Sequence, residues 1–440
     1  MSDPSSPTRA QSARPTQHQC GLTVLSLVSI LVGLVAGGIC GVFRLMLEQA
    51  DTLRTALAVH TLHGFPAGIL LVVAVSLTSF VAALMVKRLA PLASGSGIPH
   101  VEAVLAGSAR AATVWLIPVK FVGGLLAIGG GLALGREGPS VQMGATAAHA
   151  IGRALRLGAA DCRALLAAGA GAGLATAFNA PGAGAIFVLE ELVGKFEART
   201  TCSALGASVS AILVANFLLG GSPDFVAPHA PIVIDVSTQF LFLLTGLATG
   251  LLSVLYNRTL LLTLQLGERL PLSVETRAAL IGLLAGVLVW QAPHLVGGGD
   301  WVTQACLNGT FAWTVIPALF VMRLLFGSLS YAAATPGGLF APMLALGALS
   351  GLGCGTVAHA LNPTLAGDIW PFVIVGMAAM FAGSVRAPLT GIVLVTEMTN
   401  ATSLLLPLLS GSFAAMFVAD GMREAPIYEA LRIRAASDIR

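Results

Sequence analysis

The stretch Pro336-Gly-Gly-Leu-Phe-Ala-Pro342 interrupts a run from Leu324 to Gly367 that contains no Asp, Glu, Lys or Arg. A membrane helix needs only about 20 apolar residues, so this run is too long for one span. Its prolines and glycines indicate breaks within it, at Pro336 to Gly338 and at Pro342. Broken helices at membrane depth are tolerated only where the freed backbone is buried in protein or lines a cavity. The stretch therefore predicts an all-α polytopic membrane protein with broken helices.

The composition of the whole chain agrees with this prediction. Hydrophobic residues make up 56% of the 440 residues, charged residues only 10%, and the mean hydropathy is +0.88. Soluble domains usually carry about 25% charged residues. These values exclude an ordinary soluble enzyme, a disordered regulator and a nucleic-acid binder. The net charge of +3 is too small for an anionic polymer partner, and the scattered cysteines indicate neither a disulfide framework nor a metal site.

The N-terminal part is expected to begin in the cytoplasm. Residues 1–20 are too polar for a signal peptide and are interpreted as a cytoplasmic tail. The first spans are Gly21 to Phe43 and Ala67 to Val86, and Glu48 to Pro66 is expected to form a charged loop between them. Arginines before the first span and Lys87-Arg88 after the second place both of those ends inside.

Two patterns occur twice, in the same order and at a nearly constant offset. The pattern G-x3-P-x4-G begins at Gly135 and again at Gly338, a shift of 203 residues. The segment from Ala180 to Glu190 resembles the one from Ala387 to Glu397, a shift of 207 residues. Paired broken segments in two related halves mark the substrate site of many transporters. We therefore expect two related halves followed by a cytoplasmic tail: residues 21–230, 231–425 and 426–440.

Two glycine-rich motifs have the chemistry of an anion site. Ser94-Gly-Ser-Gly-Ile-Pro99 offers backbone N–H groups and the Ser96 hydroxyl at the start of an expected helix. Gly337 to Pro342 offers the N–H groups of Leu339 and Phe340 without a charged side chain, which suits an anion that must bind and also leave. Each motif alone is equally compatible with an ordinary turn or a structural helix break.

Glu137 lies between glycines in Gly135-Arg-Glu-Gly-Pro139, at the start of another expected helix. An ionisable residue within a membrane is costly, so it is a functional hypothesis by default. Its carboxylate would compete for the same positive helix end that would hold an anion. The alternative is a loop carboxylate paired with Arg136 at the surface.

Two further places near the ends of uncharged stretches are candidates. Glu190 and Glu191 are adjacent, so they point to different helix faces and at most one faces an interior pathway. The alternative for the other is a charged cytoplasmic helix end. Tyr428 lies just past the last span, where an interfacial aromatic anchor is the alternative to a site residue.

Taken together, the motifs at Ser94 to Pro99, Gly135 to Pro139 and Gly337 to Pro342 resemble the three signature motifs of the CLC family of chloride channels and chloride/proton antiporters. The resemblance covers Gly21 to Tyr428. It implies two inverted halves built of short, tilted, mostly α-helical segments. It also implies a homodimer in which each subunit has its own anion pathway.

The resemblance implies a set of anion contacts. These are the Ser96 hydroxyl, the Tyr428 hydroxyl and the backbone N–H groups of Leu339 and Phe340. Serine at this position resembles chloride-selective members, whereas nitrate-preferring plant members have proline there. His100 stands where close bacterial relatives can have an acid, and the resemblance gives it no role.

The resemblance also implies a proton route. Glu137 matches the gating glutamate that carries protons on the external side, and Gly138 supports it within the same motif. Glu191 matches the internal proton-transfer glutamate of the antiporters, which the channels lack. Glu102 and Lys120 match a buried acid and base near that internal glutamate.

We therefore expect a chloride/proton antiporter rather than an enzyme, with chloride, protons and the lipid bilayer as partners and no cofactor, metal or nucleic acid. The chain ends soon after the last span, which leaves no room for the cytoplasmic nucleotide-binding (CBS) modules of many eukaryotic members. This predicts a prokaryotic inner-membrane protein. The alternatives are a passive chloride channel on the same fold and an intramembrane enzyme, which would need a His or Cys paired with a nucleophile at membrane depth.

Overall fold

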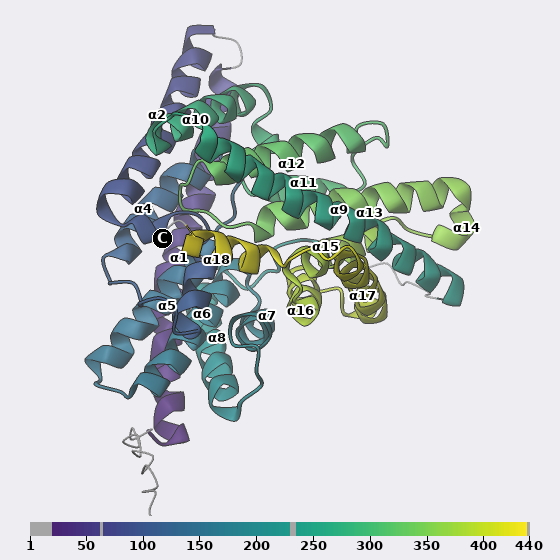
Figure 1. Ribbon diagram of the computed structural model, residues 1–440. Coiled ribbons are helices and arrows are strands. Elements are labelled where there is room, and N and C mark those ends of the chain that lie inside the picture. Colours follow the sequence, from purple (N-terminus) through teal and green to yellow (C-terminus); the bar gives the residue numbers. More distant parts are fainter. Residues whose placement is uncertain (1–19, 62–64, 229–234, 438–440) are drawn as a thin grey trace, which may run out of the picture.

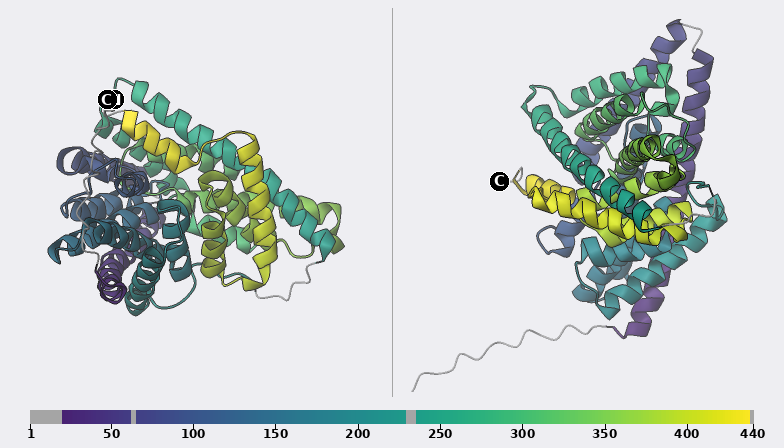
Figure 2. Two further views of the ribbon diagram at one scale, coloured as in Figure 1. Left: turned by 60° about the horizontal axis from the view of Figure 1, so that its bottom comes forward. Right: turned by 90° about the vertical axis from the view of Figure 1, so that its right-hand side faces the viewer.

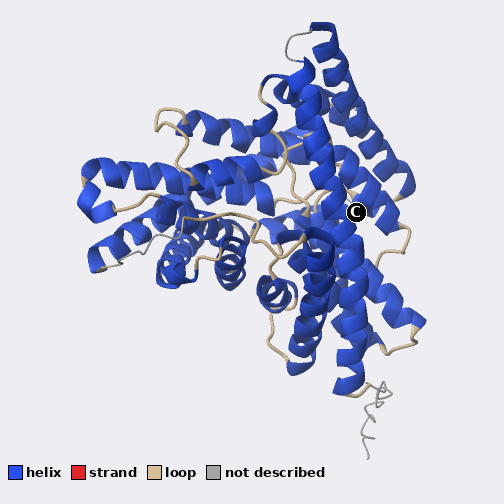
Figure 3. Ribbon diagram, turned by 180° about the vertical axis from the view of Figure 1, so that it is seen from behind, coloured by secondary structure: helices blue, strands red, loops and turns tan. Residues whose placement is uncertain are grey.

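The computed structural model describes residues 20–61, 65–228 and 235–437. Over these ranges the chain forms helices joined by loops, with no strand (Figure 3). The first part contains α1 (Leu22–Thr61), α2 (Phe65–Leu89), the 3₁₀ turn η1 (Pro91–Ala93), α3 (Ile98–Leu105), α4 (Leu116–Gly129), α5 (Glu137–Ala154), α6 (Ala159–Phe178), α7 (Pro181–Phe187), the π-helical turn η2 (Val188–Leu192) and α8 (Ala198–Leu219).

The second part has a matching series of helices. It contains α9 (Val236–Arg269), α10 (Val274–Gln291), η3 (Pro293–Leu295), α11 (Asp300–Leu307), α12 (Ile316–Ala332), α13 (Phe340–Leu361), α14 (Pro363–Ala366), α15 (Trp370–Val385), α16 (Pro388–Thr399), η4 (Thr402–Leu404), α17 (Leu405–Gly421) and α18 (Ile427–Ser437). Seven helices of the described ranges are long and apolar enough to cross a membrane. The expected all-α polytopic membrane fold is confirmed.

Helix α1 is longer than the sequence analysis expected. It contains 40 residues and continues to Thr61, through most of the segment expected as a loop. At 1.5 Å per residue it is about 60 Å long, about twice the thickness of the hydrocarbon core. It runs along most of the height of the molecule (Figure 1). The loop prediction fails because the charges beyond Phe43 are paired on the helix: Arg44 with Glu48 at 3.0 Å, and Arg54 with Asp51.

The predicted helix break is confirmed at Pro336 to Gly338, between the end of α12 and the start of α13. Pro342 does not break a helix. It lies in the first turn of α13, where a missing N–H costs no intrahelical hydrogen bond. Within its most apolar window α13 is 72% buried, compared with 33% for α1. The break therefore places a helix start deep inside the protein.

The repeated glycines of the two halves permit matching helix crossings. A methyl group added to Gly144 of α5 would lie 2.2 Å from the Gly169 carbonyl oxygen of α6. In the second half, a methyl group on Gly347 of α13 would lie 2.6 Å from the Gly376 carbonyl oxygen of α15. Only glycine allows the backbones to approach this closely.

The end of the chain folds back into the protein. Residues 1–19 of the expected N-terminal tail lie outside the described residues, but most of the expected C-terminal tail forms α18. This helix lies across the middle of the molecule (Figures 1 and 2). Tyr428 in its first turn is 0% exposed, so the interpretation as an interfacial anchor is wrong.

Two glutamates at equivalent repeat positions cap each other's helices. The Glu190 carboxylate accepts hydrogen bonds from the N–H groups of Leu389 and Thr390 at the start of α16, at 3.0 and 2.7 Å. The Glu397 carboxylate, at the end of α16, accepts from the N–H groups of Gly182 and Ala183 at the start of α7, at 3.0 and 2.9 Å. A carboxylate at a helix N-terminus satisfies free donors and the helix dipole. These reciprocal caps join the two halves.

The reciprocal caps predict a stability effect. Replacing Glu397 with Ala removes both acceptors from the start of α7 and lowers the free energy of unfolding by about 1–2 kcal/mol. The thermal unfolding midpoint of the purified protein in detergent measures this. The control is Glu268→Ala, because Glu268 is half exposed and pairs with Arg434 at the surface, where ion pairs contribute little. Equal midpoints for the two variants would contradict the capping role.

Candidate functional site

The three motif loops are joined by backbone hydrogen bonds. Gly135 and Gly338 exchange both of their hydrogen bonds, with nitrogen–oxygen distances of 2.9 and 2.7 Å. The Gly95 N–H donates to the Thr335 carbonyl, and the Gly95 carbonyl accepts from the Gly337 N–H, each at 3.1 Å. The loops before α3, α5 and α13 therefore form one unit, although the sequence separates them widely. The positive N-terminal ends of three helices start from this unit.

Glu137 lies at the centre of this unit. It is 0% exposed, and its Oε1 accepts a hydrogen bond from the Phe340 N–H at 2.6 Å. Among the described residues its Oε2 has no hydrogen-bond partner. The carboxylate thus occupies one of the backbone donors that the sequence analysis expected to serve an anion.

The guanidinium of Arg136 points to other partners. Its Nη2 lies 2.9 Å from Asp224, and its Nε donates to the Ala177 carbonyl at 2.8 Å. Asp224 also binds Arg44 at 2.7 Å and is itself only 4% exposed. The interpretation of Glu137 as a surface carboxylate paired with Arg136 is therefore wrong: Glu137 is buried, and Arg136 forms ion pairs with Asp224 and, at 3.6 Å, with Asp300.

Side-chain hydroxyls surround the same region. Ser96 and Tyr428 are both 0% exposed, and in the described part of the chain neither hydroxyl has a hydrogen-bond partner. Tyr428 interacts electrostatically with Glu137 and with the other two tyrosines, Tyr256 and Tyr331. The Ser96 N–H donates to the Tyr331 hydroxyl at 3.4 Å. Buried hydroxyls are usually hydrogen-bonded, so free donors beside helix N-termini are suited to an anion.

Gly138 makes room for Ser96. A methyl group at this position would lie 2.6 Å from the Ser96 hydroxyl oxygen and 2.7 Å from its carbonyl oxygen. Glycine is therefore needed for the motif that carries Glu137 to pack directly on the motif that carries Ser96. This close contact is a structural reason for a glycine at position 138, next to Glu137.

The Phe340 ring is held by other aromatic rings. Its centroid lies 4.6 Å from Phe381, 5.9 Å from Phe187 and 6.3 Å from Phe178, and 5.7 Å from Tyr428. Such contacts stabilise defined ring geometries. They fix the residue whose N–H binds Glu137, and they place the Tyr428 ring against it.

Lys120 holds the serine motif by hydrogen bonds to its backbone. It is 0% exposed, and its Nζ donates to the carbonyls of Ala93 and Gly95 at 3.0 and 2.7 Å. Lys120 therefore holds the turn that leads to Ser96. Glu102, the acid expected near Glu191, lines a pocket together with it.

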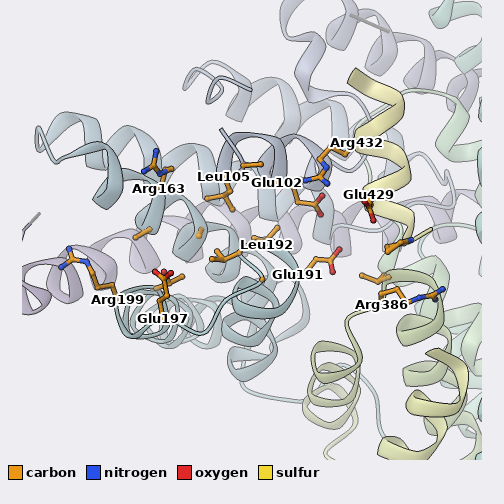
Figure 4. Close-up of a pocket in the computed structure, with 18 of the residues that line it drawn as sticks. Glu102, Leu105, Arg163, Glu191, Leu192, Glu197, Arg199, Arg386, Glu429 and Arg432 are labelled. Atoms are coloured by element: carbon orange, nitrogen blue, oxygen red, sulfur yellow. The ribbon is translucent and has the colours of Figure 1, made fainter. Parts of the chain in front are cut away.

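Glu191 and the residues next to Glu137 line separate pockets. Glu191 lies in the π-helical turn η2 and lines a pocket of about 640 Å³ (Figure 4). Gly135 and Arg136, which flank Glu137, line a second pocket of about 320 Å³. His100 lies near neither carboxylate: its ring nitrogens are 3.3 Å from Gln142 Nε2 and 3.2 Å from the Arg110 carbonyl.

Several residues of this region escape sequence reasoning. Tyr256 and Tyr331 could have been suspected, because the chain has only three tyrosines and all three are buried around the site. Asp224 lies in an unremarkable loop, and its two arginine partners are known only from the fold. Glu397 could have been suspected as the repeat partner of Glu190.

Residues 78–420 match the family described as voltage gated chloride channel. The chain belongs to the CLC family.

Within this CLC family, the H(+)/Cl(-) exchange transporter ClcA of Vibrio cholerae is 37% identical over 420 residues, which cover 92% of this chain and 88% of the relative. ClcA of Vibrio parahaemolyticus is 36% identical over 425 residues, with the same coverage of both chains.

Solved structures agree with this assignment. A slow cyanobacterial Cl-/H+ antiporter superposes with a TM-score of 0.90 at 30% identity and covers 96% of this chain and 99% of its own. A eukaryotic CLC transporter shares the fold with a TM-score of 0.81 at 24% identity, over 94% of this chain and 74% of its own.

The burial of Asp224 predicts a large effect on stability. Asp224→Asn removes the negative charge shared by Arg44 and Arg136 and leaves these poorly exposed cations only their more exposed partners, Glu48 and Asp300. The free energy of unfolding therefore falls by about 3 kcal/mol. Glu48→Gln is the matched control, because Glu48 binds the same Arg44 but is 44% exposed. Thermal unfolding in detergent compares the two. A smaller loss for Asp224→Asn than for Glu48→Gln would show that Asp224 is not the anchor.

Proposed function

We propose that this chain exchanges chloride for protons across a lipid bilayer. One observation carries the proposal: the buried Glu137 carboxylate binds the Phe340 N–H at the start of α13, beside the free hydroxyls of Ser96 and Tyr428. A titratable anion and a permeant anion would compete for the same donors. The exchangers among the relatives support the same assignment.

The chloride path uses neutral donors. Chloride binds the Ser96 and Tyr428 hydroxyls and the N–H groups of Leu339 and Phe340, in a region from which water is excluded. Dipolar donors at helix starts bind an anion without a fixed cation. The ion can therefore be held and still leave, as conduction requires.

Competition at Phe340 couples the two ions. When Glu137 is ionised, its carboxylate takes the Phe340 N–H and repels chloride from the site. Protonation removes the charge, and the neutral acid accepts only a weaker hydrogen bond from the same N–H. Chloride then replaces the carboxyl group. The carboxyl group carries its proton toward the pocket lined by Gly135 and Arg136, which is the external pocket in this proposal. Protons reach Glu137 from the internal side through Glu191, which lies off the chloride path.

The remaining assignments follow the family. The protein is transporting rather than catalytic, and we place it in the inner membrane of a prokaryote as a homodimer with one pathway per subunit. The two halves 21–230 and 231–425 are inverted repeats in this proposal. The helix crossings at Gly144 and Gly347 and the reciprocal caps of Glu190 and Glu397 support it.

Flux measurements on the purified protein in liposomes test the proposal. An outward chloride gradient should drive protons inward against their own gradient, with chloride and pH followed together. A passive channel would release chloride without uphill proton movement. A protein that moves neither ion would contradict the proposed transport altogether.

Glu137→Gln should abolish proton movement while chloride movement persists, because a neutral amide cannot carry a proton. The paired measurement of chloride release and pH in liposomes checks this. Uphill proton transport by the variant would remove Glu137 from the gate. Glu48→Gln, at a half-exposed glutamate of the outer pocket, serves as the control and should transport both ions.

The adjacent glutamates provide a matched pair. Glu191→Gln should stop proton transport and leave chloride flux, because Glu191 lines the internal pocket. Glu190→Gln should keep the proton-to-chloride ratio close to that of the wild type, because Glu190 is a helix cap for α16. The same flux assay compares them. The reverse outcome, with Glu190 the sensitive residue, would show that the choice within the pair is wrong.

A further inference from the structure

Helix α18 connects the anion site to the internal pocket. Tyr428 in its first turn is buried against Phe340, and the next residue, Glu429, is exposed and lines the pocket that contains Glu191. Successive helix residues point about 100° apart. One short helix thus presents a hydroxyl to the chloride site and a carboxylate to the proposed proton entrance.

Three carboxylates meet at one end of this pocket. They come from three separate elements: Glu102 from α3, Glu191 from η2 and Glu429 from α18, and Arg432 of α18 lies beside them (Figure 4). Figure 4 shows Arg163, Glu197 and Arg199 grouped toward the other end. The remaining charged residue that lines the pocket is Arg386.

The charges of these groups interact. Glu429 interacts electrostatically with both Glu102 and Glu191, and so does Arg432. Arg432 therefore offsets part of the repulsion among three neighbouring acids. Without such a cation, a third carboxylate at this position would be costly.

The carboxylates differ in their access to water. Glu429 is exposed, Glu191 is partly buried, and Glu102 is 7% exposed with an Oε1 that has no partner in the described part of the chain. Glu429 lies in the first turn of α18 and has no hydrogen bond or salt bridge among the described residues, so no partner holds its carboxylate. The pocket of about 640 Å³ has room for water between these groups.

We propose that Glu429 is the residue that exchanges protons with the cytoplasm and passes them to Glu191. The Glu429 carboxylate takes a proton from water at the pocket mouth. The proton then moves through pocket water to the Glu191 carboxylate, and the Glu429 carboxylate is regenerated. Transport in the other direction reverses these steps. The inference rests on the proposed role of Glu191 and extends the proton route beyond it.

The test is proton flux in liposomes at two pH values. Glu429→Gln should slow proton flux about tenfold near neutral pH, where free protons are scarce and a surface acid collects them. The defect should shrink in acid, where water supplies protons directly. Glu429→Asp keeps a carboxylate and should restore most of the flux at neutral pH.

The control tests whether α18 itself is disturbed. Glu268→Gln alters an exposed carboxylate of α9 that pairs with Arg434 of α18 and lies outside the pocket. The proton flux of this variant should match that of the wild type. Wild-type proton flux in Glu429→Gln at neutral pH would overturn the inference. So would a defect that is equal at both pH values and persists in Glu429→Asp, because that pattern is structural.

Glu191→Gln distinguishes a failure of the Glu429 role from a failure of the proposed proton route through Glu191. If Glu191→Gln abolishes proton flux and Glu429→Gln does not slow it, only the role of Glu429 fails. If Glu191→Gln still moves protons uphill, the proposed internal route fails, and the passage from Glu429 to Glu191 fails with it.

Discussion

The hydrogen bonds that Gly135 and Gly338 exchange are the constraint on which the site depends. They join two loops that the repeat makes equivalent and that the sequence separates by 203 residues. Each loop starts a helix, so the exchange sets two helix N-termini side by side in the interior. This brings Glu137 within 2.6 Å of the Phe340 nitrogen. In the proposed mechanism, the carboxylate and chloride compete for this one donor.

The two halves are also joined by a second reciprocal contact, at the starts of α7 and α16. Glu190 and Glu397 are equivalent in the repeat: Glu190 caps α16, which contains Glu397, and Glu397 caps α7, which precedes Glu190. A carboxylate at a helix start is stabilised by free N–H groups and by the helix dipole. The cap also holds the turn from which Glu191 enters the internal pocket. The same contacts therefore stabilise the fold and place the residue that we propose for internal proton transfer.

Some polar side chains of the interior are hydrogen-bonded or ion-paired, whereas others have no partner in the described part of the chain, and the second set includes the proposed anion contacts. Lys120 binds carbonyls of the serine motif, and Asp224 binds two arginines beside Glu137. In contrast, the hydroxyls of Ser96 and Tyr428 have no partner in the described part of the chain. Burying a polar group without a partner costs free energy, which the contacts of the hydrogen-bonded and ion-paired groups around it must offset.

The sequence alone determined the membrane fold, the repeat and the chemistry of the motifs. Apolar runs broken by Gly and Pro, and patterns that recur at nearly constant offsets, are visible in the sequence itself. They located Ser96, Glu137 and Phe340. Only the tertiary structure decided which groups meet: that α1 continues to Thr61, that Tyr428 is buried, and that Glu190 caps α16. These depend on contacts between residues far apart in the chain, because burial and capping are properties of packing that no local pattern encodes.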